Sequence, residues 1–281
     1  MIEAVGARTM GGVNNIGRFA RFAWQSLGAS FRSCLSPGTY SLIWTQMNLI
    51  GVRSVPVVMI TGAFVGMTLA VQAYDQLAGM GLEEHLGVLI NISVVKELGP
   101  VLAAVMLAGR IGGALTAELG TMNVTEQIDA VRSMGTDPIR YLAAPRVVAC
   151  LLLTPFLIIF ADLLGIIGGY FVSVVHLGIN SRAYWSFSAS GVELWDVSIG
   201  VVKGFFFGVA LAAISCYKGF TCKEGARGVG QACTEAFVAS FISILALDFA
   251  LAVIFKAIYS TFWPLKSLVR RKSRTHCETR Y

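Results

Sequence analysis

Long apolar blocks separated by short polar stretches dominate the pattern along the chain. Five blocks have at least roughly the 20 residues that a helix needs to cross about 30 Å of hydrocarbon, and they cover residues 54–74, 86–119, 147–177, 195–217 and 232–262. The second block is too long for one straight span, and Gly99 followed by Pro100 predicts a kink or break inside it. The pattern predicts an all-α integral membrane protein with about five transmembrane helices.

The segment before the first block has a different periodicity. In residues 15–35 the arginines fall mostly opposite an apolar face formed by Ile16, Phe19, Ala23, Leu27 and Phe31. This predicts an N-terminal amphipathic helix in the membrane interface, with packing on a soluble partner as the alternative. We therefore assign residues 1–53 to a cytoplasmic or interfacial segment, 54–262 to the transmembrane domain and 263–281 to a basic C-terminal tail.

Composition supports a membrane protein and narrows its partners. Hydrophobic residues make up 56% of the chain and charged residues 14%, against about a quarter charged in soluble domains. The net charge of +6 comes from basic residues at the ends of apolar blocks, which favours an anionic lipid surface and no nucleic-acid partner. The six cysteines show no metal-ligand spacing and are expected to be free thiols, so no metal site is predicted.

The distribution of Lys and Arg predicts the orientation. The first loop carries none and the third carries Arg182, whereas the second and fourth are basic through Arg132, Arg140, Arg146, Lys218, Lys223 and Arg227. This places the N-terminus, residues 120–146 and residues 218–228 in the cytoplasm. With five spans, the basic tail at 263–281 then lies outside, against its own charge.

Residues 120–146 predict a short amphipathic helix between two spans. Gly135 can end this helix, and Asp137 followed by Pro138 is typical of the N-cap and first position of a second short helix. The apolar ridge of the helix before Gly135 consists of Val124, Ile128, Val131 and Met134. From spacing alone, a docking helix for a cytoplasmic motor and a helix resting on the bilayer are equally good interpretations.

The same region carries a family resemblance. Residues 108–146 read AGRIGGALTAELGTMNVTEQIDAVRSMGTDPIRYLAAPR and closely resemble the MlaE/YrbE family of ABC-transporter permeases. The preceding KELGPVLAAVMLAGR, the later LALDFALA and the order of elements over residues 15–262 are similar to the same family. The basic tail is longer than this family pattern implies.

The resemblance implies an assembly in the bacterial inner (cytoplasmic) membrane. It implies a multi-pass permease that pairs with a second copy of itself and with cytoplasmic ABC ATPase subunits, which would bind ATP and Mg. It further implies a periplasmic MCE-domain lipid-binding protein and, in some systems, a STAS-domain protein. The implied substrate is phospholipid, moved between inner and outer membranes to maintain outer-membrane lipid asymmetry.

The resemblance also favours the docking interpretation of the cytoplasmic helix. The segment Glu126–Met134 matches the family's coupling helix, which sits in a cleft of the ATPase. The predicted coupling-helix residues are Glu126, Ile128, Asp129, Val131, Arg132 and Met134.

Ionisable residues inside the apolar blocks are candidates for function or internal pairing, because charge in lipid is costly. Lys96 and Glu97 precede the break at Gly99 and match the family segment that lines the lipid cavity between protomers, where Lys96 could pair with a phosphate. Tyr74 is a weaker candidate, since an aromatic there can be an interface anchor. For Arg110, Asp162 and Asp248, function and structural ion pairing remain equally open.

Enzyme motifs are absent from the sequence. It contains no G-x-x-x-x-G-K-[ST], G-x-S-x-G or H-E-x-x-H run, so we expect no catalysis and no cofactor in this chain and assign ATP hydrolysis to a partner. The alternatives are an ion-coupled secondary transporter using the buried ionisable residues, and a non-transporting membrane scaffold.

Overall fold

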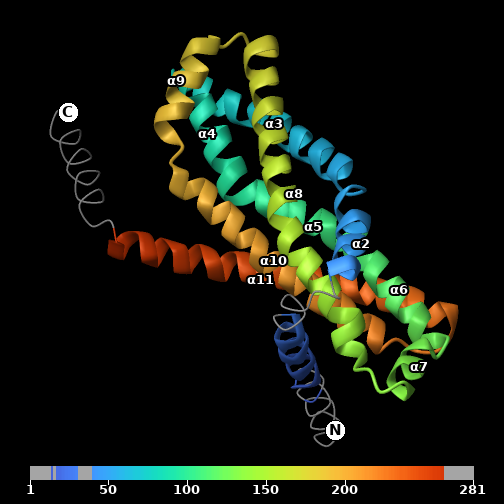
Figure 1. The fold of residues 1–281 in the computed structure, drawn as a ribbon. Coiled ribbons are helices and arrows are strands. Elements are labelled where there is room, and N and C mark those ends of the chain that lie inside the picture. The colour runs from blue at the N-terminus through green and yellow to red at the C-terminus, as the bar shows by residue number, and fades with distance from the viewer. Residues whose placement is uncertain (1–13, 15–16, 31–39, 263–281) are drawn as a thin grey trace, which may run out of the picture.

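The computed structural model describes residues 14, 17–30 and 40–262, and every regular element in these residues is a helix (Figure 1). Five helical runs are long and apolar enough to cross a membrane, which confirms the predicted number of spans. They are Val55–Ala78, Glu83–Val124, Ile139–His176, Leu194–Phe220 and Gly225–Thr261. The basic tail at 263–281 lies outside the described residues.

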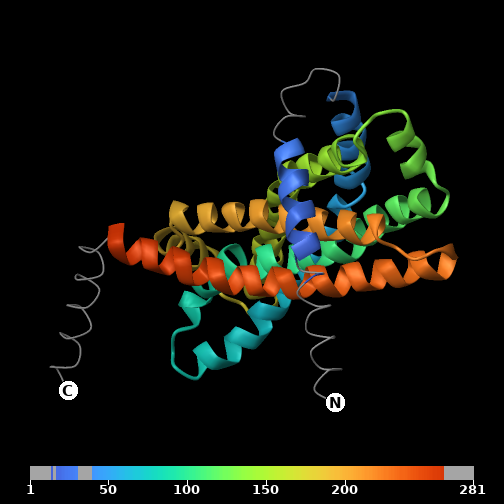
Figure 2. The ribbon, with the colours of Figure 1, turned by 90° about the horizontal axis from the view of Figure 1, so that it is seen from below.

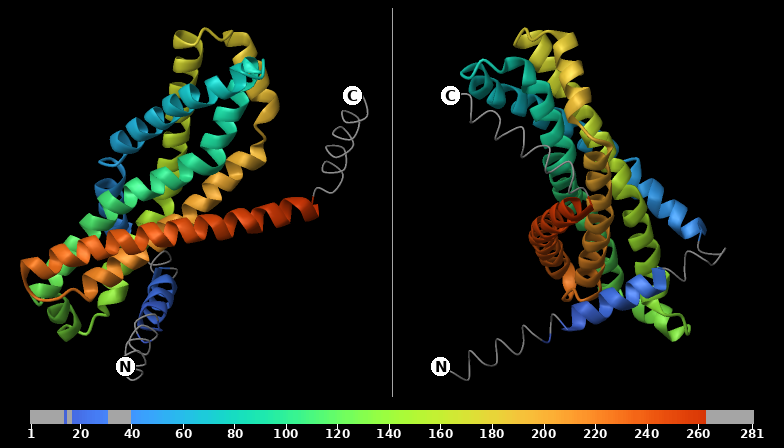
Figure 3. Two further views of the ribbon diagram at one scale, coloured as in Figure 1. Left: turned by 180° about the vertical axis from the view of Figure 1, so that it is seen from behind. Right: turned by 90° about the vertical axis from the view of Figure 1, so that its left-hand side faces the viewer.

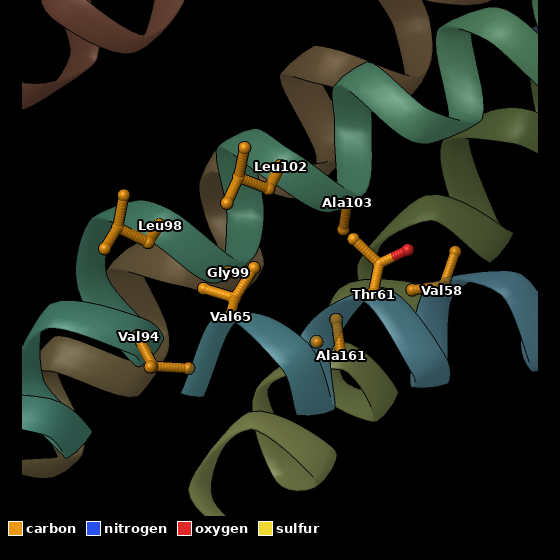
Figure 4. A pocket seen from close by; sticks show the side chains of 10 residues that line it. Val58, Thr61, Val65, Val94, Leu98, Gly99, Leu102, Ala103 and Ala161 are labelled. Carbon is orange, nitrogen blue, oxygen red and sulfur yellow. The ribbon is translucent and has the colours of Figure 1, made fainter. Parts of the chain in front are cut away.

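The first and third spans pack through small residues. A Cβ atom on Gly62 of α3 (Val55–Ala78) would collide with the backbone of Ala161 on α8 (Ala144–Phe171), and one on Gly66 would collide with Gly165. Such residues let helix backbones approach closely in lipid. Figure 4 shows the adjoining contact of α3 with the second span and Ala161, where a space of about 10 Å³ lies at the lower limit for one water molecule. It is a helix interface rather than a binding pocket.

The second span stays helical through its predicted break. It comprises η2 (Glu83–His85), α4 (Leu86–Ser93), η3 (Val94–Leu98), α5 (Gly99–Leu107), η4 (Ala108–Gly112) and α6 (Gly113–Val124). Both η3 and η4 are π-helical turns. Because Pro100 has no N–H and its ring would clash with the carbonyl of Lys96 in a regular α-helix, a wider turn before it relieves the conflict. The third span contains two further π turns, η5 (Ile139–Ala143) and η6 (Val172–His176).

The fourth and fifth spans differ in their place in the bundle. Helix α10 (Leu194–Phe220) packs tightly on α8, since a Cβ on Gly208 would lie 2.6 Å from the carbonyl oxygen of Cys150. Helix α11 (Gly225–Phe262) packs on α6 and α10, and its C-terminal part diverges from the other helices (Figures 1 and 3).

The segments that the Lys and Arg pattern predicts to be cytoplasmic gather at one end of the bundle. The helix at 17–30, α7 (Gln127–Ser133) and the turn at 221–224 lie there, whereas α9 (Ser181–Gly191) and η2 lie at the other end (Figures 1 and 3). The helix at 17–30 crosses the bundle instead of following it (Figures 2 and 3).

The bundle covers one side of the helix at 17–30, and the described residues of its predicted apolar face are half-buried there. The ring of Phe19 lies 5.4 Å from that of Tyr217, and the ring of Phe22 lies 5.6 Å from that of Phe220. Trp24 is 81% exposed and is available to the membrane interface. Ile16 and Phe31 lie outside the described residues. An additional helix, α2 (Tyr40–Gly51), follows and packs on α8.

A buried polar contact fixes α9 to the second span. The Tyr184 hydroxyl donates to Asn91 Oδ1 at 3.3 Å, and Asn91 Nδ2 donates to Ser188 Oγ at 2.9 Å. Burial raises the pKa of Tyr184 to about 12, so the hydroxyl keeps its proton at neutral pH. This contact holds the segment that leads into α10.

Candidate functional site

A fully buried lysine joins three helices. The Lys203 ammonium on α10 lies 2.7 Å from Glu97 Oε2 in η3 and 2.8 Å from Asp248 Oδ1 on α11, and it donates to the carbonyl oxygen of Lys96 at 3.2 Å. The Lys203 side chain is 0% exposed. A buried ammonium requires nearby opposite charge, because desolvation makes an isolated one very costly. We call Lys203, Glu97 and Asp248 the Lys203 cluster.

The backbone around η3 brings α10 close enough for this contact. A Cβ on Gly200 would lie 2.6 Å from the carbonyl oxygen of Val95, so glycine permits the close approach of α10 to the π turn. Lys203 follows three residues later and shares the same helix face. The π turn and the glycine together position the lysine against Glu97.

Lys96 belongs to a second ion pair. Its ammonium lies 3.1 Å from Asp196 Oδ1, and the exposed fractions of the two side chains are 40% and 12%. Asp196 Oδ2 also accepts from the Glu193 backbone N–H at 3.2 Å, within a capping box that begins α10. The adjacent residues Lys96 and Glu97 thus pair with different positions of α10, and part of the Lys96 side chain remains accessible.

These pairs border a cavity of about 470 Å³ between η3, the start of α10 and the C-terminal half of α11. Its apolar wall includes Ile92, Ile199, Ala252 and Phe255. Its charged lining residues are Lys96, Glu97, Glu193, Asp196 and Lys256. The volume is within the range of small-molecule sites, and the lining offers both signs of charge beside apolar surface. We call it the mixed-charge cavity.

The other ionisable residues predicted inside the spans have different surroundings. Asp248 is paired in the Lys203 cluster. Arg110 lies in η4 and borders a cavity of about 150 Å³ with Arg53 and Glu118. Asp162 is buried against Gly99, and its Oδ1 has no hydrogen-bond partner among the described residues. The structure thus favours ion pairing for Asp248 and leaves Arg110 and Asp162 separate from the mixed-charge cavity.

Tyr74, the third residue predicted for a lipid cavity, lies elsewhere. It is partly buried on α3 and packs against the apolar cluster that contains Leu86 and Ile90. It is not among the residues that line the mixed-charge cavity.

Lys203, Asp196 and Lys256 were not among the predicted site residues, although Lys203 and Lys256 are ionisable residues inside apolar blocks, as Asp248 is. Asp196 and Lys203 are seven residues apart, which places both on one helix face. This spacing was the signal available in the sequence. Nothing in the spacing of Lys256 reveals that it borders the same cavity.

The predicted coupling helix is present as α7, and its ridge is divided between two surfaces. Ile128 is buried at 3% exposure, in a cluster with Phe22 and Leu142 of the same chain. Val131 is half-buried, and Met134 is 73% exposed. Ile128 therefore attaches α7 to the bundle, and the surface open to a partner begins at Met134.

The exposed face of α7 also carries charged residues. Arg132 Nη1 donates to Asp129 Oδ1 at 3.1 Å, and both side chains are exposed. Glu126 precedes the helix with φ at 58° in the left-handed region. An exposed pair of this kind adds little stability, so these side chains are free to contact another protein.

The predicted end of the coupling helix and the start of the next one are confirmed. Gly135 has φ at 75°, and the Thr136 N–H donates back to the Val131 carbonyl at 3.4 Å. Asp137 Oδ1 accepts from the Ile139 N–H at 3.0 Å, with Pro138 as the first helical residue. The second helix is not a short separate one, because it continues through η5 into the third span.

Buried ion pairs inside a bundle of five candidate spans, together with a cavity of mixed charge, define a multi-pass membrane protein with the features of a transport subunit.

Comparison with known proteins identifies the family. The model described as "Permease MlaE" matches residues 43–254. The chain is 41% identical to a probable ABC transporter permease protein of Rickettsia felis, over 90% of this chain and 96% of the relative. It is 38% identical to the intermembrane phospholipid transport system permease protein MlaE of Haemophilus influenzae, over 76% and 83%. The chain therefore belongs to the MlaE family of ABC-transporter permeases.

Proposed function

We propose that this chain is the inner-membrane subunit of an ATP-driven transporter that moves phospholipid between the inner and outer membranes and so maintains outer-membrane lipid asymmetry. The Haemophilus relative is named for intermembrane phospholipid transport. The observation that carries the proposal is the mixed-charge cavity, which adjoins the Lys203 cluster inside the span region.

The cavity suits a phospholipid headgroup with its first acyl carbons. Lys96 and Lys256 are cations that can pair with a phosphate, and Glu193 is an anion that can attract a headgroup amine. Phe255 and Ile92 supply apolar surface for the glycerol and acyl region. Glu97 is held by Lys203, so its proposed role is to fix the cavity wall rather than to bind the amine directly.

The proposed partners follow from the family and from the exposed surfaces. A cytoplasmic ATPase that binds ATP and Mg would contact α7 through Asp129, Arg132 and Met134. A second copy of this chain would complete the permease, and an MCE-domain protein on the outer side would exchange lipid with it. A STAS-domain protein is a further candidate partner.

The second span offers a route for coupling. Helix α7 follows the helical run Glu83–Val124 after a turn at Thr125 and Glu126, and this run contains η3 and Glu97. A displacement of α7 by the ATPase would move this run and change the distances within the Lys203 cluster. Nucleotide could then bias the cavity between two states through differential contacts.

A transfer assay tests the cavity. We expect Lys96→Met to lower ATP-dependent phospholipid transfer about tenfold, the loss expected for one charge-assisted hydrogen bond to a phosphate. Unfolding should change little, because the Lys96–Asp196 pair is partly exposed. Arg182→Met removes an exposed cation on α9, at the same end of the bundle, and is the matched control. Normal transfer and normal co-purified lipid in both Lys96→Met and Glu97→Gln would contradict the proposal.

Co-purification tests the coupling surface. Met134→Asp combined with Arg132→Glu should release the ATPase subunit and leave the spans folded, because both side chains are exposed. Arg182→Glu, a charge reversal at the opposite end, should retain the ATPase. Full ATPase retention by the α7 double variant would exclude this surface as the docking site.

The buried Lys203 cluster makes ion coupling the alternative that deserves a direct test. In the reconstituted complex, ATP-driven transfer should continue when a protonophore abolishes the proton gradient. Transfer that requires the gradient and no ATP would favour a secondary transporter. Absence of any transfer by the complete complex would favour a scaffold.

A further inference from the structure

A second cavity, of about 370 Å³, lies at the opposite end of the bundle from α9. It is bordered by the helix at 17–30, the end of α10 and the start of α11 (Figure 3). Its charged lining residues are Arg18, Lys218, Lys223 and Glu235. We call it the basic cavity. It shares no lining residue with the mixed-charge cavity.

The single carboxylate of the basic cavity is already occupied. Glu235 Oε2 lies 2.8 Å from the Lys218 ammonium, and Glu235 Oε1 accepts from Gln231 Nε2 at 2.9 Å. Three basic side chains and one acidic side chain give a formal charge of 3 − 1 = +2. The lining therefore attracts an anion, with Lys223 at the turn and Arg18 across from it on another helix.

The walls of the basic cavity are anchored to the bundle. A Cβ on Gly228 would collide with the Lys223 backbone, so the turn packs directly on the first part of α11. Asn123 Nδ2 donates to the Cys222 carbonyl at 3.3 Å, which fixes the same turn to the end of α6. Anchoring of this kind reduces the ordering cost of binding a ligand.

We propose that the basic cavity binds the phosphate group of an anionic phospholipid from the leaflet at this end of the bundle, which the Lys and Arg distribution predicts to be cytoplasmic. The volume suits a headgroup rather than a single small ion. Clustered basic residues beside a membrane surface select anionic lipids. Trp24, 81% exposed on the helix that carries Arg18, is typical of a side chain at headgroup level.

Such a lipid is a structural ligand, distinct from transported cargo. It would bridge the helix at 17–30 to the turn at 221–224, and through Asn123 to the helix that leads into α7. Occupancy would therefore stabilise the end of the bundle where the ATPase is proposed to dock. A soluble phosphate ester offers the same chemistry, and the experiment separates the two sources.

Thermal unfolding of the full-length protein in neutral detergent tests the site. Short-chain phosphatidylglycerol should raise the melting temperature, whereas phosphatidylcholine of the same chain length should not. Lys223→Gln and Arg18→Gln should each raise the half-saturating phosphatidylglycerol concentration about fivefold, the loss expected for one basic residue at an anionic surface. Both side chains are exposed, so folding should be retained.

Two comparisons decide the outcome. Arg227→Gln removes an exposed cation on the first turn of α11 that does not line the cavity, and it should bind phosphatidylglycerol as the unaltered protein does. Stabilisation by glycerol 3-phosphate equal to that by the lipid would assign the phosphate site to a soluble anion and overturn the lipid assignment. Equal responses to both lipids, or equal losses for Arg227→Gln and Lys223→Gln, would overturn the site itself.

Discussion

Helices α10 and α11 are neighbours in sequence and are joined by two ion pairs, Lys203–Asp248 and Lys218–Glu235, yet they take different places in the bundle. In the most apolar stretch of each span, 56% of the residues of α10 are buried against the rest of the chain, whereas 17% of those of α11 are buried. Both stretches are apolar enough to cross a membrane. Overall apolarity therefore does not reveal which span forms the core of a membrane bundle.

Small residues distinguish the two spans. Helix α10 carries Gly200, Gly204 and Gly208 at four-residue spacing, and a Cβ on any of them would meet another helix at less than 3 Å. Helix α11 presents large apolar side chains outward, including Phe249 at 73% exposure and Ile242 at 60%. In lipid, close packing replaces water exclusion as the driving force, so the glycine stripe marks the face of α10 that packs on other helices.

Removing Lys203, which pairs with both the second span and α11, should have the largest effect on stability. Lys203→Met leaves Glu97 and Asp248 facing one another without a cation and should destabilise the fold by about 3–5 kcal/mol. Lys256→Met, an exposed lysine on α11, is the matched control and should change the free energy of unfolding by less than about 0.5 kcal/mol. Unfolding in detergent measures both.

A rescue variant tests whether uncompensated charge causes the loss of stability. Adding Glu97→Gln and Asp248→Asn to Lys203→Met removes the uncompensated charges and should recover most of the lost stability. Equal stability of Lys203→Met and Lys256→Met would mean that the Lys203 cluster contributes nothing to the core position of α10.

Replacing one glycine by alanine should change the free energy of unfolding by a smaller amount. The change should be destabilising in α10 and stabilising in α11. At Gly204 a Cβ would meet Ile158 Cδ1 at 2.8 Å and the Pro155 Cα at 3.1 Å, so Gly204→Ala should cost about 1–3 kcal/mol. At Gly230 on α11 a Cβ meets nothing within 4 Å, so Gly230→Ala should stabilise by up to about 1 kcal/mol. Destabilisation by both would show that α11 is packed against a surface beyond the chain.

The smallest effect is expected on the outward face of α11. Phe249→Leu keeps an apolar side chain in an exposed position and should shift the free energy of unfolding by less than about 0.5 kcal/mol. Cross-linking in bilayers gives a second measurement. A loss of the proposed dimer with unchanged unfolding would show that a second copy covers this face, whereas unchanged cross-linking would assign the face to lipid.

The elements that the sequence could predict are those specified by local rules. Span number follows from the length of apolar blocks, and the boundary at Gly135, Asp137 and Pro138 follows from capping chemistry. The ion pairs could not be predicted, because Glu97 and Lys203 are 106 residues apart and their contact depends on how each span is rotated about its axis. Apolar blocks contain little information about that rotation.

Amphipathic periodicity was similarly incomplete. It predicted a covered face for the helix at 17–30 and for α7, but it could not say what covers them. The structure shows that the bundle covers Ile128, which belongs to the predicted ridge of α7, and Phe22, which does not belong to the predicted face of the helix at 17–30. The ends of α6 and α10 provide apolar side chains there. A second protein would therefore need to cover only part of the α7 ridge, whereas the sequence pattern implied that it would cover all of it.

The π turn at η3 has a consequence for sequence change in this protein. A π turn accommodates one residue more than an α turn, so deleting one residue from Val94–Leu98 could be absorbed by an ordinary helix without opening a gap. The two flanking segments would keep nearly their present rotation, because the wider turn already takes up the roughly 100° that one residue adds to an α-helix. Only the residues of the turn itself would be re-aimed, and Glu97 is one of them. A one-residue deletion here would leave a protein whose spans pack as before and whose contact between Glu97 and Lys203 is altered.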